Sequence, residues 1–244
     1  MSLRTRLGHL YRKLLAPVHF SASRAELHEL LRDLPDTPAG WFAMTERYKG
    51  RGNFAWISGW QVESELLSML ESARQAKPKV IAEIGTARGA TLLPWCRMAQ
   101  AKVLSIDLEG GIHGGGYLPI RQRLYQEFTW GRPGVQLHLL QENSQSPATV
   151  AKAKEFLQND AIDVLFIDGD HTYQGVKKDF ELWSPLVRPG GLIFFHDILP
   201  HKTVEHCEVD KLWAELKPRY PHAEFIGDPK QGWAGIGMLT QPGV

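Results

Sequence analysis

The stretch that decides the fold is VIAEIGTARGAT, residues 80–91. Its apolar start predicts a buried strand, the glycines at 85 and 89 predict a turn, and the residues from Thr91 predict a helix start. A strand, a glycine turn and a helix in this order let the backbone approach a ligand closely, because glycine adopts dihedral angles that a side chain forbids. The stretch therefore predicts a ligand-binding turn in an α/β protein.

An acidic residue follows the turn at a spacing that is typical of nucleotide-binding folds. Asp107 ends a second apolar run about 20 residues further on, the offset at which a carboxylate reaches ribose hydroxyls in nucleotide-binding α/β folds. The dinucleotide fingerprint G-x-G-x-x-G is missing, because Ala87 stands where its middle glycine would be. We therefore expect this turn to bind a dinucleotide pyrophosphate less well.

Strand and helix patterns alternate from Lys79 to the end of the chain. The apolar runs have no polar face, as a parallel sheet covered by helices requires. We predict a Rossmann-like α/β fold with a seven-stranded, mostly parallel sheet, helices on both faces and a hairpin-like terminal pair of strands. The predicted strands are 80–84, 103–106, 135–140, 162–167, 192–195, 224–226 and 235–239, and the predicted helices are 61–75, 90–98, 120–128, 147–157, 173–183 and 209–216. On the first of these helices we expect Glu65 to lie outside.

The first 60 residues predict a helical N-terminal extension and an aromatic-rich segment, with residues 61–244 as the main domain. Residues 1–20 predict a basic amphipathic helix, which docks on its own domain or a dimer mate, or lies on an anionic membrane surface. Ser23 and Glu26 form a capping-box pattern that predicts a second helix over residues 23–34.

The segment from Trp41 to Trp60 is rich in aromatic residues and glycine, and we expect it not to form a regular helix. Two interpretations stay open for it. It either forms a lid over a ligand or supplies packing for the N-terminal layer.

The composition excludes several classes of protein. The net charge of +1 offers no general field for nucleic acid, and no apolar run approaches the roughly 18 residues that span a bilayer. Cys96 and Cys207 lie far apart without a C-x-x-C pair, which indicates neither a zinc site nor a disulfide framework. We therefore expect a cytoplasmic protein without a transmembrane segment or a nucleic-acid partner.

Polar residues and two glycines stand at the edge where ligands bind in open α/β sheets. They are Glu83, Gly85 and Gly89 after the first strand, Asp107 and Glu109 after the second, Asn143 and Ser144 after the third, Asp168, Asp170 and His171 after the fourth, and His196 and Asp197 after the fifth. A carboxylate that ends a buried strand needs a partner or a metal ion, because its burial alone is costly.

Two motifs resemble class I S-adenosylmethionine-dependent methyltransferases. One is Glu83-x-Gly85-x-x-x-Gly89. The other is FIDGDHTYQGV at 166–176, followed by Asp179 and by LVRPGGLI at 186–193. The resemblance is to the branch with small-molecule and sugar O-methyltransferases and cephalosporin-hydroxylase-like proteins. It covers residues 50–240 and includes the loop from Gly110 to Tyr117, which either binds nothing or closes over the substrate.

The resemblance implies S-adenosylmethionine as the cofactor. Its binding residues would be Glu83, Gly85, Thr86, Gly89, Asp107, Asn143 and Ser144. Glu83 would lie near the amino group of the methionine part, Asp107 would hold the ribose, and Asn143 with Ser144 would border the adenine. Ser144 has an alternative interpretation as the N-cap of the helix that follows Pro147.

The resemblance also implies a divalent metal site at Asp168, with His196 and Asp197 as the other ligands. His196 departs from the pattern of metal-dependent relatives, because Mg²⁺ prefers oxygen and imidazole suits softer metals. Three hypotheses stay open: Mg²⁺ held by the two carboxylates and water, another divalent ion that uses His196, or no metal, with His196 as a base.

Methylation of a hydroxyl requires that the hydroxyl lose its proton to a base or under the influence of a metal. Asp170 and His171 are the candidate bases, with His196 next, and His171 has the alternative role of orienting Asp168. The sequence thus predicts methylation of a hydroxyl on a small molecule or sugar. The competing hypotheses are a nicotinamide-dependent oxidoreductase and a non-catalytic cofactor-binding partner subunit.

Overall fold

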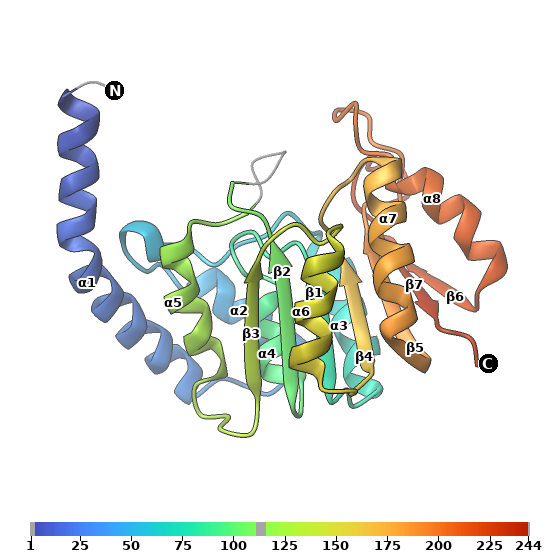
Figure 1. Ribbon diagram of the computed structural model, residues 1–244, viewed down its shortest axis with the longest axis horizontal. Coiled ribbons are helices and arrows are strands. Elements are labelled where there is room, and N and C mark those ends of the chain that lie inside the picture. The colour runs from blue at the N-terminus through green and yellow to red at the C-terminus, as the bar shows by residue number, and fades with distance from the viewer. Residues whose placement is uncertain (1–2, 111–115, 244) are drawn as a thin grey trace.

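The computed structural model describes residues 3–110 and 116–243, with only the backbone described for residues 3–14. One seven-stranded sheet of order β3-β2-β1-β4-β5-β7-β6 forms its centre (Figure 1). The strands are β1 (Val80–Ile84), β2 (Lys102–Asp107), β3 (Gln136–Gln141), β4 (Ile162–Ile167), β5 (Val187–His196), β6 (His222–Phe225) and β7 (Ile236–Thr240). The first five are parallel, and β7 pairs antiparallel with both β5 and β6. The predicted fold class, including the terminal hairpin-like pair, is confirmed.

The helices cover both faces of the sheet. The N-terminal part supplies α1 (Leu3–Arg32), α2 (Pro38–Arg47), α3 (Glu63–Gln75), α4 (Leu92–Met98) and α5 (Gln122–Tyr125), and the C-terminal part supplies α6 (Pro147–Leu157), α7 (Tyr173–Trp183) and α8 (Val209–Leu216). Short 3-10 turns lie at Gly52–Phe54, Pro119–Arg121, Gln126–Thr129, Ser184–Leu186 and Lys217–Arg219. The predicted helix over 120–128 is therefore α5 with a 3-10 turn on either side.

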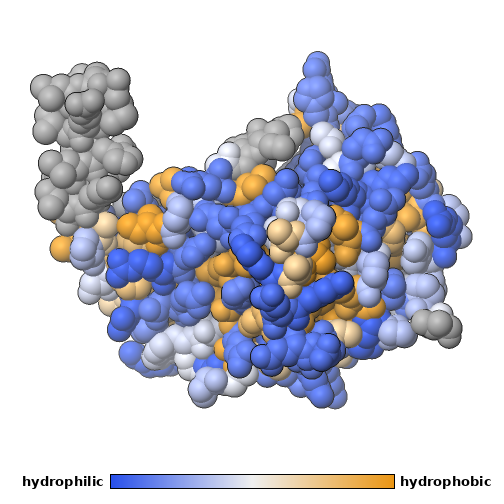
Figure 2. All heavy atoms as spheres, in the orientation of Figure 1, coloured by the Kyte–Doolittle hydropathy of each residue, from blue (hydrophilic) through white to orange (hydrophobic). Residues whose placement is uncertain are grey.

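Alternation along the strands divides the core into two layers. On β1, Ile81 packs into the cluster that contains residues of α1 to α5, while Ala82 and Ile84 pack into the cluster that contains residues of α6 to α8. Successive side chains of a strand point to opposite faces, so a fully apolar strand contributes side chains to both layers of the core. Over α6 and α7 the outer surface is mostly hydrophilic, with apolar residues showing between the helices (Figure 2).

The helix α1 corrects one prediction. The structure has a single helix from Leu3 to Arg32 where two were expected, so Ser23 and Glu26 do not form a capping box. Ser23 Oγ accepts a hydrogen bond from the Arg51 N–H at 2.8 Å, and Glu26 accepts from the backbone N–H groups of Lys49 and Gly50. Both side chains thus bind the segment that leads from α2 to the sheet.

The N-terminal helix docks on its own domain over the part whose side chains are described. Ala16, Leu27 and Leu31 are buried, whereas the basic side chains of residues 4–13 lie outside the described set. In Figure 1 the first turns of α1 stand clear of the rest of the chain. None of the described helices combines the length and the apolar character that crossing a membrane requires.

The helix α2 corrects a second prediction, because residues 38–47 of the aromatic-rich segment are a regular helix. Thr37 caps it by accepting from the Gly40 N–H, and Pro38 occupies the first turn, where its missing N–H costs nothing. Trp41 is fully buried and packs the N-terminal layer, whereas Trp60 is 81% exposed. The segment therefore contains both packing residues and exposed aromatic ones.

Candidate active site

Two turns meet where the strand order changes direction. Gly85 follows β1 with φ +91°, and a Cβ there would lie 1.9 Å from the carbonyl oxygen of Asp168, which follows β4. The Asp168 N–H also donates to the Ile84 carbonyl at 2.8 Å. The strand β1 lies between β2 on one side and β4 on the other. The strand order reverses here, and such a topological switch point is where ligands bind in open α/β sheets. Only glycine fits at position 85.

The glycine turn is closed by the acidic residue of β2. One oxygen of Asp107 accepts from the N–H groups of Thr86 and Ala87, at 2.9 and 2.7 Å, and the other accepts from the Leu108 N–H. Burial raises the pKa of Asp107, although these backbone hydrogen bonds oppose the rise. Asp107 remains partly exposed beside the turn, and Gly89, with φ +83°, packs against Tyr125.

Glu83 lies beneath the turn, fully buried. Its two carboxyl oxygens accept from the hydroxyls of Thr91 and Ser105, each at 2.9 Å, and Ser105 also contacts the Thr86 hydroxyl. Burial raises the pKa of Glu83 to about 8, against the lowering effect of the two hydroxyls. The carboxyl group is therefore shielded from solvent and connected to the turn through hydroxyl groups.

Asn143 and Ser144 follow β3 at the same edge of the sheet. Asn143 is exposed, and its side-chain oxygen accepts from the Gln145 N–H. Ser144 Oγ donates to Asp179 on α7 at 2.7 Å. The N-cap position of α6 is occupied by Ser146, so the alternative role of Ser144 as that N-cap is wrong.

Four ionisable side chains converge after β4 and β5. Asp168 Oδ1 lies 3.3 Å from both His171 Nε2 and His196 Nδ1. Asp197 Oδ2 lies 3.3 Å from His171 Nδ1 and 3.2 Å from His196 Nδ1. The two carboxylates and the two imidazoles thus alternate around a ring. We call Asp168, His171, His196 and Asp197 the carboxylate–imidazole ring.

Charge couples the members of this ring. Burial by itself lowers the pKa of both imidazoles, but the two carboxylates, and at His171 also a hydrogen bond with Cys207, outweigh it and raise the pKa to about 11 at His171 and about 10 at His196. Burial raises the pKa of Asp168 and Asp197, yet the imidazoles hold both pKa values below the usual range. Two negative charges at this depth are therefore matched by two positive ones.

Two further side chains hold the carboxylates in place. Gln61 Nε2 donates to Asp168 Oδ2 at 2.9 Å, and His201 Nε2 lies 2.8 Å from Asp197 Oδ1. Asp197 has φ +63°, a strained backbone conformation for a residue other than glycine. No motif in the sequence points to Gln61 or His201. The spacing of four residues between Asp197 and His201 was the only signal for the latter.

The structure does not bring Asp170 to the ring. Its carboxylate accepts from the N–H and the hydroxyl of Thr172, at 3.0 and 2.8 Å, and from the Gln145 amide at 3.2 Å. These contacts cap the turn at the start of α7, and Asp170 lines a cavity of about 480 Å³ together with Lys177 and Lys178. Of the candidate bases, His171 and His196 are the two that lie in the ring.

The glycine-rich loop lies mostly outside the described residues, which exclude 111–115. Its last residue, Tyr117, is buried, and its ring packs edge-on against Tyr125 at 5.0 Å between centroids. This position places Tyr117 in the packing behind the glycine turn.

Several known proteins are similar to this chain in sequence or in fold. Residues 82–198 match the model of a family described as a methyltransferase domain. The uncharacterized protein y4gI of Sinorhizobium fredii is 29% identical over 171 residues, which are 67% of this chain and 17% of that protein. The chain thus spans about a sixth of the length of that relative.

Two solved structures share the fold. An O-methyltransferase from Bacillus cereus, in complex with S-adenosylhomocysteine, aligns with a TM-score of 0.56 and 17% identity over 89% of this chain and 90% of that one. The O-methyltransferase TomG from Streptomyces achromogenes, in complex with S-adenosylmethionine, aligns with a TM-score of 0.55 and 14% identity over 77% of this chain and 82% of that one.

The likeness to methyltransferases thus rests on the family match over residues 82–198 and on the shared fold. The family match runs from Ala82 in β1 to Ile198 just beyond β5. It includes the glycine turn and all four members of the carboxylate–imidazole ring.

Proposed function

We propose that this protein transfers a methyl group from S-adenosylmethionine to a hydroxyl of a small molecule or sugar, with the help of a divalent cation. The observation that carries the proposal is the contact between Gly85 and Asp168, which joins the cofactor turn to the carboxylate–imidazole ring. A methyl donor on one side of this contact and an activated hydroxyl on the other would be neighbours.

The residues present fit the cofactor. Gly85 and Gly89 keep the turn free of side chains, and Asp107, which is partly exposed beside it, presents a carboxylate where ribose hydroxyls would lie. Asn143 would lie along the adenine, while Glu83 would act through the hydroxyls that bind it. S-adenosylmethionine would supply an electrophilic methyl group at this place.

The residues present also fit a divalent cation. One ligand atom each from Asp168, His196 and Asp197 lies within 4.8 Å of the others. The ring balances two carboxylates with two imidazolium charges, and a cation of charge +2 balances them equally well, leaving both imidazoles neutral. When bound, such a cation would lower the pKa of an acceptor hydroxyl. Two oxygens and one nitrogen suit Mn²⁺, Fe²⁺ or Co²⁺, whereas Mg²⁺ would be held by the two carboxylate oxygens and water.

His171 is the residue we assign as the base. Its side chain is 26% exposed, whereas that of His196 is 4% exposed, so an acceptor can reach His171 from solvent. A neutral His171 accepts the hydroxyl proton. Gln61 and His201 hold the carboxylates of Asp168 and Asp197 in position. Methyl transfer itself requires mainly that donor and acceptor be held in line.

Two exposed tryptophans that adjoin contact residues of the site in the chain support an acceptor with a flat or ring-shaped body. Trp60 precedes Gln61, which contacts Asp168, and Trp233 precedes Ala234, whose backbone nitrogen lies 3.3 Å from His201 Nε2. Both tryptophans expose large apolar faces, at 81% and 37%. Aromatic faces of this kind provide contact area while polar groups fix the orientation of a ligand.

The experiment is methyl transfer from isotopically labelled S-adenosylmethionine to a panel of sugars and catechols, with Mg²⁺, Mn²⁺ or EDTA. We expect turnover with a cation and its loss in EDTA. The variant Asp168→Asn should lose at least about 100-fold in turnover and retain affinity for S-adenosylhomocysteine. Asp33→Asn, at an exposed carboxylate beside the end of α1, is the control. Turnover that survives in Asp168→Asn contradicts the proposal.

A further inference from the structure

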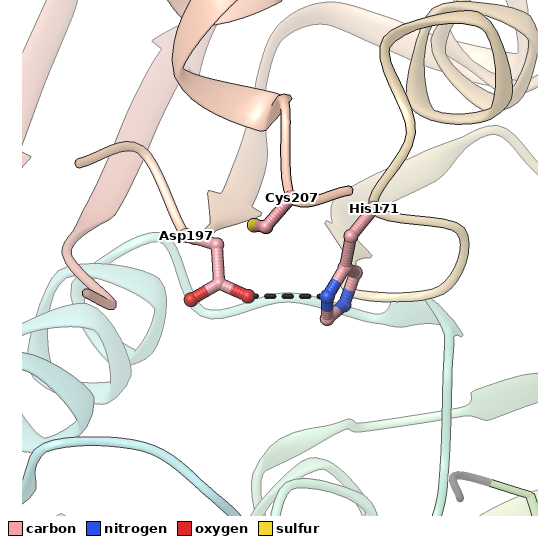
Figure 3. Close-up of side chains that lie close together, drawn as sticks. All are labelled: His171, Asp197 and Cys207. Carbon is pink, nitrogen blue, oxygen red and sulfur yellow. Dashed lines mark ion pairs between the residues drawn. The ribbon is translucent and has the colours of Figure 1, made fainter. Parts of the chain in front are cut away.

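A second group of metal-ligand atoms lies beside the ring, and the proposed methyl transfer leaves its cysteine unused. His171, Asp197 and Cys207 offer ligand atoms that all lie within 4.8 Å of one another. The three residues come from the turn after β4, the end of β5 and the segment before α8, and their side chains converge (Figure 3). Asp197 and Cys207 are buried, while His171 is partly exposed, so a small ion can reach the group.

The backbone holds these three segments together. The Glu208 N–H, next to Cys207, donates to the carbonyl of His171 at 2.8 Å, and the Glu208 side chain accepts from the Tyr173 N–H at 3.2 Å. Asp197 is fixed through Oδ1 by His201, which leaves Oδ2 facing His171 Nδ1. The three ligands are thus positioned by contacts other than those between themselves.

The spacing and chemistry of the group fit a tetrahedral cation. Two ligands at about 2.0–2.1 Å from such an ion lie roughly 3.4 Å apart, and His171 Nδ1 lies 3.3 Å from Asp197 Oδ2. A thiolate, an imidazole and a carboxylate are ligands of Zn²⁺ and Co²⁺, whereas Mg²⁺ prefers oxygen alone. Three protein ligands leave a fourth position for water.

We propose that His171, Asp197 and Cys207 form a second cation site, selective for thiophilic ions of the Zn²⁺ class. On binding, the Cys207 thiol and the His171 imidazolium each give a proton to solvent, and the sulfur and the imidazole nitrogen become ligands. The site shares Asp197 with the set Asp168, His196 and Asp197 and also takes up His171. A bound Zn²⁺ therefore withdraws a ligand and the base from methyl transfer, and inhibits it. The inhibition rests on the proposed function, whereas the site itself does not.

The test of the site is the absorption spectrum of the full chain titrated with Co²⁺ under reducing conditions. We expect a thiolate-to-cobalt charge-transfer band in the near ultraviolet, together with the intense visible bands of tetrahedral Co²⁺. The band should vanish in Cys207→Ser, and Co²⁺ affinity should fall at least tenfold in His171→Asn. Thermal unfolding of each variant confirms that it is folded.

Two variants serve as controls. Cys96→Ser removes the other cysteine, which is buried in α4, and should retain the band. Asp168→Asn changes a side chain that contacts His171 but is not one of the three ligands, and it should also retain the band. A band that is missing in the wild-type protein, persists in Cys207→Ser or disappears in Cys96→Ser would overturn the site.

The inhibitory role has its own readout. Equimolar Zn²⁺ should lower the Mg²⁺-supported turnover of the wild-type protein at least tenfold and leave Cys207→Ser much less affected. Equal inhibition of both proteins would overturn the regulatory half of the proposal. If neither protein turns over under any condition, the proposed function fails, and the Co²⁺ spectrum still decides the site.

Discussion

Gln61 Nε2 donates a hydrogen bond to Asp168 Oδ2 at 2.9 Å and so ties the segment ahead of α3 to the carboxylate after β4. The two residues are 107 positions apart in the chain. Groups that orient metal-binding or catalytic carboxylates typically matter by 10- to 100-fold in affinity or activity.

We therefore expect Gln61→Ala to lower turnover by roughly 10- to 100-fold and to raise the cation concentration needed for half-maximal rate. The measurement is the rate of methyl transfer as a function of Mg²⁺ and Mn²⁺ concentration. Gln75→Ala, at the exposed end of α3, is the matched control and should behave as the wild type. An unchanged cation dependence in Gln61→Ala would show that this hydrogen bond does not position Asp168.

The contact between Gly85 and Asp168 yields a prediction about stability and binding. Gly85→Ala places a Cβ 1.9 Å from a carbonyl oxygen at φ +91°, so the two turns must move apart. Gly131→Ala is the control, because it has a similar φ of +77° and nothing within 4 Å. We expect the control to lose about 1–2 kcal/mol of unfolding free energy and Gly85→Ala to lose more, together with affinity for S-adenosylhomocysteine.

Chemical denaturation and calorimetric titration provide the two readouts for these glycine variants. Equal losses in Gly85→Ala and Gly131→Ala would mean that the close approach of the two turns has no energetic consequence.

Glu65 is a buried carboxylate that joins α3 to a distant loop. It accepts from the N–H groups of Gly227 and Gly235, both at 2.9 Å, and from the Gln231 amide at 2.8 Å. Glu65→Ala leaves these donors without their acceptor, so we expect a loss of about 3 kcal/mol in unfolding free energy. Glu71→Ala, at an exposed position of the same helix, should change it by less than about 0.5 kcal/mol. Similar losses in the two variants would contradict the assigned role.

Glu83 predicts a pH dependence of stability in the cofactor-free protein. Its pKa is raised from 4.5 to about 8, chiefly by burial, so the folded state holds a proton there that the unfolded state releases. The contribution of Glu83 to the unfolding free energy is therefore greatest below pH 4.5 and decreases as the pH rises toward 8. Glu83→Gln keeps a neutral side chain, and the fall in unfolding free energy between pH 5 and 8 should be smaller than in the wild type. Equal slopes would refute the raised pKa.

The sheet was predictable because its information is local. The runs around Ile81, Val103 and Val164 are apolar on both faces, and each leads into a turn whose polar residues identify the binding edge. The site residues Asp168, His171, His196 and Asp197 could be listed for the same reason. Whether they meet depends on strand order, which the structure supplies.

The errors arose where side chains serve distant partners. The Ser23 and Glu26 pattern has the spacing of a capping box, but both side chains bind the segment at 49–51. Glu65 lies on a predicted amphipathic helix where we expect an exposed side chain, but it is buried, because its partners lie 162 to 170 residues away. The helix α2 begins at Pro38 with Thr37 as its N-cap, and the two residues are a helix-start signal, but the aromatic and glycine-rich composition of residues 41–60 is not typical of a regular helix.

The central claim, that the glycine turn binds S-adenosylmethionine, is tested most directly by thermal unfolding with S-adenosylhomocysteine and with NAD, each in Mg²⁺ and in EDTA. A ligand at about 100 times its dissociation constant adds roughly 2.7 kcal/mol, which for a chain of this length raises the melting temperature by about 5–10 °C. We expect this rise with S-adenosylhomocysteine and none with NAD. A rise with NAD alone would contradict the claim and favour a nicotinamide-dependent enzyme on the same sheet.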